Sequence, residues 1–401
     1  MGNLGKVTGV VAEYNPFHNG HKYMIEKCRE NGATHIVAVM SGNFVQRGSV
    51  AIMDKRARAR AAIESGVDLV IELPVCWAVS TAELFARGGV SILDSLGCVD
   101  TLSFGAECDD AALLRKAAVA VCDSRVDALI KEELQGGISY PKARENAVRN
   151  VFGDEIAEVL SKPNNILAVE YIKALEDFNS TIGLDPILRK GAQHDSLKEN
   201  GEFSSASALR ILLEREDKKA YEYMPEPSVK EFERLKAVGR APVCFDESER
   251  AILSRLRMLS VEDIEKAPDV SEGLQNRIYN AIQTATSLEE LYDIIKTKRY
   301  THSRIRRIIT ALYLGITPED AQMDMPYIRV LGFNGRGREI LKEIKDTAKL
   351  PVIMKSSQMA VLSEEARHVF DLECKATNLY NLSTPRILPC GTELSDEIVM
   401  E

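Results

Sequence analysis

The chain has 401 residues, of which 45% are hydrophobic, and a formal net charge of −9 at pH 7. A chain of this length is expected to form two or three domains and to bury a sizeable core. The negative charge argues against a protein that binds nucleic acid over its whole surface, but it is compatible with a local basic patch.

The sequence also argues against membrane, secreted and zinc-binding proteins. It contains no run of about 18 apolar residues, and its start, "MGNLGKVTG", lacks the basic and apolar regions of a secretory signal. The eight cysteines form no CxxC pair, which favours free thiols over disulfides or a zinc site. We therefore expect a cytoplasmic protein with no membrane contact and no metal held by its own side chains.

The first 105 residues alternate between apolar runs and amphipathic segments. Such alternation predicts strands joined by helical crossovers, and hence an α/β, Rossmann-like parallel sheet with helices on both faces. The expected strands are 7–13, 34–41, 67–74 and 99–105, and the expected helices are 19–31, 54–66 and 81–97.

The rest of the chain is expected to be mainly helical. Residues 109–178 have a helical pattern, 182–191 a fifth strand, and 203–217 a helix that a serine can cap. Three prolines indicate a linker at 218–245. We therefore expect a catalytic domain at 1–217, the linker, and a helical domain at 246–401.

The turn "EYNPFHNGH", residues 13–21, follows the first expected strand. Ligands of open α/β sheets bind beyond the carboxyl ends of the strands. The helix after the turn offers free N–H groups there, Gly20 permits close approach, and His18 and His21 can donate ring N–H bonds to phosphate oxygens. The pattern favours a triphosphate site. The alternative is a capped helix with two incidental histidines.

The segment "PFHNGH" resembles the HxGH signature of the nucleotidyltransferase superfamily, which includes the class I aminoacyl-tRNA synthetases. In that superfamily both histidines stabilise the phosphates while an attacking oxygen displaces pyrophosphate. "SSASALR", residues 204–210, resembles its second motif, a serine-rich turn that opens a helix ending in arginine. The resemblance implies the following catalytic residues: His18, His21, Ser204, Ser205 and Arg210.

Further blocks resemble a narrower family, the tRNA(Met) cytidine acetate ligases. They are "EYNPFHNGH", "MSGNFVQRG", "DKRARARAAIESGVDLVIELP", "FGAE", "PNNILAVEY", "ILRKGAQH" and "KRYTHSRIRRI". This resemblance implies that acetate attacks ATP to give acetyl-adenylate and pyrophosphate. The acetyl group would then pass to the exocyclic amine of the wobble cytidine of elongator tRNA(Met), with Mg²⁺ expected beside the ATP.

The same resemblance implies a set of ATP contacts in four of the blocks. These are Val11, Ala12, Glu13, Tyr14, Asn15, Pro16, Phe17, His18, Asn19, Gly20, His21, Met24, Gly105, Asn164 and Arg189.

Each of these contacts has a structural alternative. Gly105 can serve only to close a turn, Asn164 can cap the helix after Pro163, and Arg189 can be a surface charge at the end of a strand. The loop at 40–48 is expected either to be solvated or to cover the acyl site.

Residues 296–349 contain twelve Lys or Arg and six Asp or Glu, in contrast to the acidic chain as a whole. Basic segments with interleaved aromatics can neutralise RNA phosphates and stack bases, although many charged helix faces are merely solvated. The segment and the resemblance together predict these tRNA contacts: Arg299, Arg304, Arg306, Arg307, Arg336 and Arg338.

The sequence therefore predicts an ATP-dependent acetate–tRNA ligase. Two alternatives remain open: a nucleotidyltransferase that adenylates a small phosphorylated metabolite, and an RNA-binding protein with an inactive nucleotide site.

Overall fold

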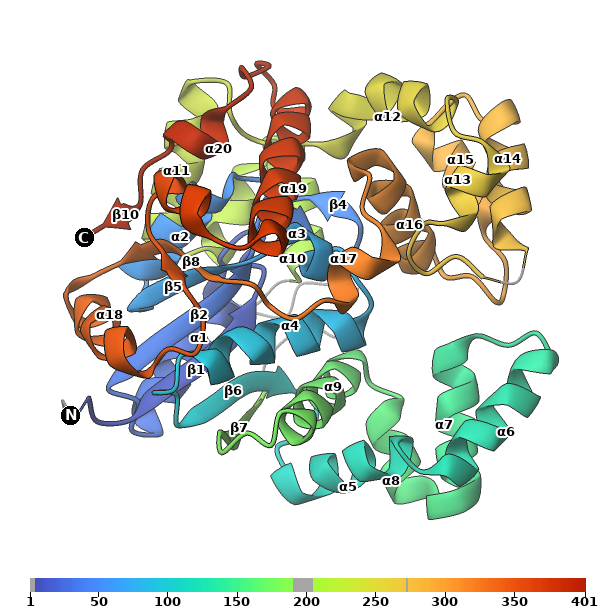
Figure 1. Ribbon diagram of the computed structural model, residues 1–401, viewed down its shortest axis with the longest axis horizontal. Coiled ribbons are helices and arrows are strands. Elements are labelled where there is room, and N and C mark those ends of the chain that lie inside the picture. Colours follow the sequence, from blue (N-terminus) through green and yellow to red (C-terminus); the bar gives the residue numbers. More distant parts are fainter. Residues whose placement is uncertain (1–3, 190–204, 272) are drawn as a thin grey trace.

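The structure is a computed structural model that describes residues 4–189, 205–271 and 273–401 (Figure 1). At its centre lies a sheet built from β1 (Val7–Ala12), β2 (His35–Ser41), β5 (Leu69–Leu73), β6 (Thr101–Ala106), β7 (Gly183–Leu188), β8 (Ile328–Phe333), β9 (Val352–Ile353) and β10 (Val399–Met400). The strands follow the order β10–β8–β5–β2–β1–β6–β7, and β9 pairs with β8.

The neighbouring strands β5–β2–β1–β6–β7 are all parallel, as the alternating sequence predicted. β1 pairs with β2 from Val7 opposite His35 to Ala12 opposite Met40. Alternate side chains of β2 enter two separate cores, with Val37 on one face of the sheet and Ile36 on the other. A sheet buried on both faces requires such near-continuous apolar strands.

Helices cover both faces of this sheet. One face packs against α4 (Ala82–Ser95), α9 (Pro163–Asp177) and α18 (Gly335–Thr347), and the other against α1 (Asn19–Glu30) and α2 (Lys55–Glu64). The short α3 (Val75–Ala78) follows β5, and a hairpin of β3 (Phe44–Val45) and β4 (Ser49–Val50) follows β2. The α/β fold class is therefore confirmed.

A helical insertion separates β6 from β7 and forms the lower right lobe in Figure 1. It contains α5 (Ala111–Val121), α6 (Ser124–Gln135), α7 (Tyr140–Phe152) and α8 (Asp154–Leu160). The helical pattern predicted for 109–178 is thus present in the structure.

The segment expected to be a linker is folded instead. After α10 (Ala206–Glu214), the chain forms the 3₁₀ helix η1 (Lys218–Tyr223) and α11 (Glu226–Ala237), which pack on α2. Pro225 is the N-cap of α11 and Pro227 lies in its first turn, where a missing N–H costs nothing. The prolines therefore mark the start of a helix and not a linker.

The remaining helices are α12 (Glu249–Leu256), α13 (Val261–Glu265), α14 (Leu274–Thr284), α15 (Leu288–Ile295), α16 (His302–Leu314), α17 (Pro318–Gln322), α19 (Glu364–Tyr380) and α20 (Thr392–Ser395). Short 3₁₀ helices lie at η2 (Phe245–Ser248), η3 (Ser356–Val361) and η4 (Asn381–Ser383). Helices α12–α16 form the upper right lobe in Figure 1.

The expectation that 246–401 forms a purely helical domain is corrected by β8, β9 and β10. β8 pairs antiparallel with β5, so the carboxy-terminal part of the chain extends the amino-terminal sheet. All six residues of β8, "IRVLGF", are buried. Among the described residues, no helix combines the length and apolar character needed to cross a membrane.

Candidate active site

The turn at 13–21 connects the carboxyl end of β1 to α1, as predicted, and its two histidines cap the helix together. The Gly20 N–H donates to His18 Nδ1 at 3.0 Å, and the His18 N–H donates to His21 Nδ1 at 3.2 Å. The rings stack with their centroids 3.8 Å apart. Because both Nδ1 atoms accept a bond, each neutral ring carries its proton on Nε2.

Both histidines are neutral in this environment. Burial, followed by the charges of Arg189 and Arg210, lowers the pKa of His18 to about 3. Burial, followed by His18 and Arg189, lowers the pKa of His21 well below its usual value. Desolvation disfavours the charged form of an imidazole. The pair therefore offers two neutral Nε2–H donors beside cationic arginines, which suits a bound polyanion.

Two arginines fix the backbone of the turn. Tyr14 has a φ of +47°, in the left-handed region that a tyrosine rarely adopts. Arg58 donates to the Glu13 carbonyl at 2.6 Å, and Arg210 donates to the Asn15 carbonyl at 2.9 Å. A strained residue persists where its surroundings over-determine its conformation, and these two bonds flank Tyr14 on both sides.

Arg58 was not predicted as a site residue, yet it organises this edge of the sheet. Its side chain is fully buried and also donates to the carbonyls of Met53, Ser41 and Gly42. Within the described part of the chain it forms no ion pair. The sequence block "DKRARARAAIESG" contains Arg58, but no local signal separates it from its basic neighbours.

The hairpin at 44–50 is partly buried and is bonded to the histidine turn. The backbone N–H of Gln46 donates to Glu13 Oε1 at 2.8 Å, and Asn43 is buried, with its amide bonded to Thr377. The Ile52 N–H donates to Asn15 Oδ1 at 2.8 Å. The hairpin is therefore part of the wall that supports the histidine turn at 13–21.

The second predicted motif lies beside the first. Ser205 is the N-cap of α10 and accepts a bond from the Ala208 N–H, whereas Ser204 lies outside the described residues. Arg210 contacts Ser207 at 3.2 Å in addition to the turn. The structure thus brings the Arg210 end of the motif against the histidine turn.

Arg189 extends over Gly105 at the ends of β7 and β6. A Cβ built on Gly105 would lie 3.2 Å from Arg189 Cγ, so the glycine leaves room for the arginine to pass. Within the described residues, the Arg189 side chain forms no hydrogen bond or ion pair. Its charge nevertheless reaches both histidines, as their lowered pKa values indicate.

The asparagines at the start of α9 have different roles. Asn165 is buried, and its Oδ1 accepts the backbone N–H groups of Glu107 and Cys108. Asn164 is partly exposed and donates to Glu107 Oε1 at 2.5 Å. The N-cap of α9 is Lys162, so Asn164 is not the cap. Of the two asparagines, Asn164 is the one accessible to a ligand.

The predicted ATP contacts in the turn fall into two groups. Tyr14, Asn15, Pro16 and Phe17 are buried, and the Tyr14 and Phe17 rings lie 5.0 and 5.5 Å from the His21 ring. These aromatic side chains therefore support a histidine. The partly exposed group consists of Val11, Ala12, Glu13, Asn19, Gly20 and Met24.

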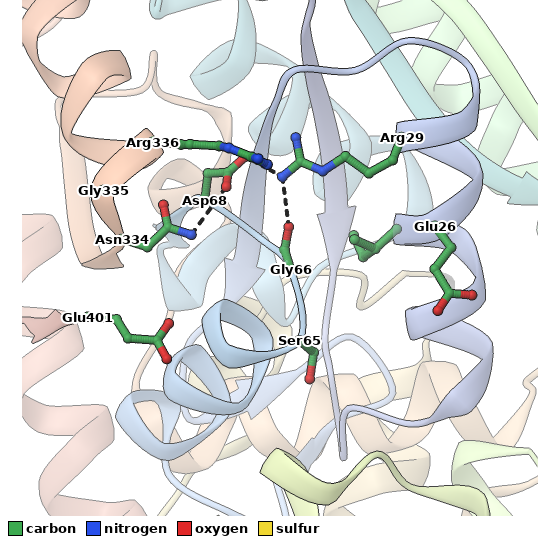
Figure 2. Close-up of a pocket in the computed structure, with 10 residues that line it drawn as sticks. Glu26, Arg29, Ser65, Gly66, Asp68, Asn334, Gly335, Arg336 and Glu401 are labelled. Carbon is green, nitrogen blue, oxygen red and sulfur yellow. Dashed lines mark hydrogen bonds and ion pairs between the residues drawn. The ribbon is translucent and has the colours of Figure 1, made fainter.

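A cavity of about 510 Å³ lies at the opposite edge of the sheet, away from the histidines. Figure 2 shows Arg29 and Arg336 extending toward each other above Asp68, with Asn334 beside them. Arg29 pairs with Asp68 at 2.6 Å. The cavity is thus distinct from the candidate active site. It contains Arg336, one of the predicted tRNA contacts.

Among the described residues, no group of three or more His, Cys, Asp or Glu is arranged to hold a metal ion.

Comparison with known proteins identifies the family. The HIGH Nucleotidyl Transferase family matches residues 5–391. The tRNA(Met) cytidine acetate ligase of Caldanaerobacter subterraneus subsp. tengcongensis is 44% identical, with 94% of each chain covered. That of Acetivibrio thermocellus is 38% identical, with 98% of this chain and all of the relative covered. The chain belongs to the tRNA(Met) cytidine acetate ligase family.

Solved structures of this family agree with the fold. The apo crystal structure of Thermotoga maritima TmcAL has a TM-score of 0.94 and 35% identity, over 98% of this chain and 99% of that one. A second structure of that protein, bound with alpha-thio ATP, has a TM-score of 0.92 at the same identity and coverage. The resemblance read from the sequence blocks is confirmed.

The six predicted tRNA contacts do not share one surface of this ligase-family chain. Arg304, Arg306 and Arg307 lie on α16, and Arg299 lies just before it, whereas Arg336 and Arg338 lie on α18. Figure 1 shows α16 and α18 on opposite sides of the molecule. The two basic segments are therefore separate features.

Proposed function

We propose that this protein is an ATP-dependent ligase that activates acetate as acetyl-adenylate and acetylates the wobble cytidine of elongator tRNA(Met). The observation that carries the proposal is the neutral His18–His21 pair, whose Nε2–H groups lie beside Arg189 and Arg210 at the carboxyl edge of a parallel sheet. The ATP-analogue complex of a 35% identical relative gives it independent support.

In the first step, a carboxylate oxygen of acetate attacks the α-phosphorus of ATP, and the bond to pyrophosphate breaks. Negative charge grows on the leaving group. Donors that are already positioned stabilise such charge most effectively, which is the role that we assign to His18 and His21. Arg189 and Arg210 add positive charge. The two arginine bonds around Tyr14 keep the donors in place.

In the second step, the exocyclic amine of cytidine attacks the acetyl carbonyl carbon, AMP leaves, and the amine loses a proton. A cytidine amine is a weak nucleophile, so a mixed anhydride is a suitable donor. We propose that tRNA reaches the site over the α16 lobe and that the reaction takes place in the cytoplasm. Any Mg²⁺ is expected to arrive with the ATP phosphates, and no step above depends on it.

Two assays test this function. Acetate-dependent exchange of label between pyrophosphate and ATP measures the first step and separates an acetate ligase from both alternatives. Transfer of labelled acetyl groups to purified tRNA, followed by nucleoside mass analysis, measures the second.

The identity of the acetyl donor distinguishes the adenylate mechanism from direct acetyl transfer. We expect acetate with ATP to yield acetylcytidine, because the site has phosphate-facing donors and free acetate is a poor electrophile. Acetyl-coenzyme A without ATP should yield none. Incorporation from acetyl-coenzyme A alone would overturn the adenylate mechanism even if acetylcytidine were the product.

A further inference from the structure

The three arginines of α16 differ in what they contact. Arg304 donates to the Asp269 carbonyl at 2.8 Å and forms an ion pair with its carboxylate at 3.1 Å. Arg307 forms an ion pair with the same carboxylate, also at 3.1 Å. Asp269 therefore neutralises part of the charge on both. These two arginines fix the loop between α13 and α14.

The Arg306 side chain does not share the Asp269 contact. It is exposed, and within the described residues it forms no ion pair or side-chain hydrogen bond. Its guanidinium lies over the Tyr292 ring, 5.4 Å from the centroid. A cation held over an aromatic face keeps its charge and its donors available to a ligand.

The backbone at Arg306 lies directly against the hairpin of the candidate active site. Gly48 has a φ of +69°, and a Cβ built there would lie 2.4 Å from the Arg306 carbonyl carbon and the Arg307 nitrogen. Two residues earlier, the Gln46 N–H bonds to Glu13 of the histidine turn. The hairpin thus fixes the distance between α16 and the nucleotide site.

The charges of Arg306 and Arg47 also reach Arg210. Burial is the main cause that lowers the pKa of Arg210; the charges of Arg47 and Arg306 act in the same direction, and those of Glu13 and Glu214 oppose them. Arg210 itself is occupied by the Asn15 carbonyl and Ser207. Arg210 and Arg306 therefore lie near enough to interact electrostatically across the hairpin.

We propose that Arg306 binds a backbone phosphate of the RNA substrate at the mouth of the nucleotide site, and that the Gly48 contact sets its distance from the adenylate. The ligand class is an RNA phosphodiester. The histidines and Arg189 are already assigned to the ATP triphosphate in the proposed function, which leaves Arg306 for a different phosphate. This inference rests on the proposed function, since it names the residue that positions the acetyl acceptor.

The test compares Arg306→Ala with Arg255→Ala, which removes an exposed arginine from α12 in the same lobe. For Arg306→Ala, we expect kcat/KM for tRNA to fall about 10-fold, the size of one lost charge-assisted contact. The log–log salt slope of tRNA binding should fall by about 0.7–0.9, the value for one phosphate contact. Arg306→Lys should retain the slope because it keeps the charge. Arg255→Ala should match the wild type.

Acetate-dependent ATP–pyrophosphate exchange distinguishes the possible ligands. A loss of exchange in folded Arg306→Ala equal to its loss of tRNA acetylation would assign Arg306 to ATP and overturn the proposal. An unchanged salt slope would assign it to solvent and overturn it as well. If the wild type bound tRNA without acetylating it, the proposed function would fail, while the salt slopes would still decide the role of Arg306.

Gly48→Ala tests whether the spacing between α16 and the hairpin matters for acetylation. The added methyl group must push α16 away from the hairpin, so we expect tRNA acetylation to fall more than exchange does, with tRNA affinity nearly retained. Equal tRNA acetylation in the wild type and a folded Gly48→Ala would overturn this part of the proposal.

Discussion

Two arginine-rich helices, α2 and α16, use their charges in opposite ways. In α2, "KRARARAAIE", Lys55 and Arg58 are buried, with exposed fractions of 3% and 0%. In α16, "HSRIRRIITALYL", Arg306 is exposed. Lys55 and Arg58 of α2 act inward on the carboxyl ends of the strands, whereas Arg306 of α16 remains at the surface.

The surroundings explain the difference. Lys55 lies among Glu72, Glu373 and Glu393, at 2.5, 3.4 and 2.7 Å. Burial, followed by the charge of Glu72, raises the pKa of Glu373 to about 8. Arg58 faces strand-end carbonyls. A residue in a basic run is therefore a candidate RNA contact only where the fold supplies neither a carboxylate nor a carbonyl to oppose it, as at Arg306.

The largest effect is expected on stability, when the buried Arg58 of α2 is replaced. Arg58→Met leaves four carbonyls, three of them buried, without their donor, so we expect the free energy of unfolding to fall by about 3–5 kcal/mol. Urea unfolding measures it. Arg60→Met on the same helix is the matched control, because the Arg60 side chain is 41% exposed and its ion pair with Glu231, at 3.6 Å, is long. Equal losses in both variants would refute the assigned role of Arg58.

The next effect concerns chemistry and not stability. His18→Ala or His21→Ala should leave the fold intact and reduce acetate-dependent exchange by roughly 10²–10³, the cost of one preorganised donor. Exchange kinetics and thermal melting should be measured on the same preparations. Normal exchange in a folded variant would remove the histidines from the mechanism.

A smaller effect is the loss of folding stability at acid pH that the buried His18 causes. The folded pKa of His18 is about 3, below its unfolded value of 6.5. Between these values the unfolded chain binds more protons, so stability is retained above about pH 6.5 and falls as the pH decreases. The slope from one such group is at most about 1.4 kcal/mol per pH unit. His18→Gln should flatten urea-derived stability between pH 6.5 and 4.5. An unchanged slope would mean that His18 also titrates normally when folded.

The smallest effect concerns Arg304, and it distinguishes this arginine from Arg306 on the same helix. Arg304→Ala breaks a partly exposed ion pair and its bonds to Asp269, which should cost about 1 kcal/mol of stability. It should also reduce the salt slope of tRNA binding less than Arg306→Ala does. If the order of the two slopes were reversed, Arg304 and not Arg306 would be the RNA contact.

Local sequence was sufficient for the elements that its periodicity encodes. The runs at 7–13, 34–41, 67–74 and 99–105 form β1, β2, β5 and β6, and the histidine turn lies where strand-end reasoning placed it. Crossover connections make such neighbours in sequence neighbours in space, so no long-range information was needed.

The missed features depend on contacts between distant residues. "IRVLGF" forms β8 because β5 offers it an edge some 250 residues earlier in the chain, and its immediate neighbours contain no sign of this. Arg58 is a site residue because carbonyls from three separate segments converge on it. Asn164 and Asn165 both bond Glu107 of the β6–α5 loop, and what separates them is that Asn165 is buried whereas Asn164 is partly exposed.

The antiparallel addition of β8 has a consequence for how the chain is made. Until the ribosome has produced residues 328–333, the apolar strand β5 has one open edge, and Glu72 lacks its partner Arg329. Unpaired apolar edges are templates for aggregation. A nascent chain or recombinant fragment ending near residue 217 would carry both histidines and still present this edge, so we expect such a fragment to aggregate when it is separated from the rest of the chain.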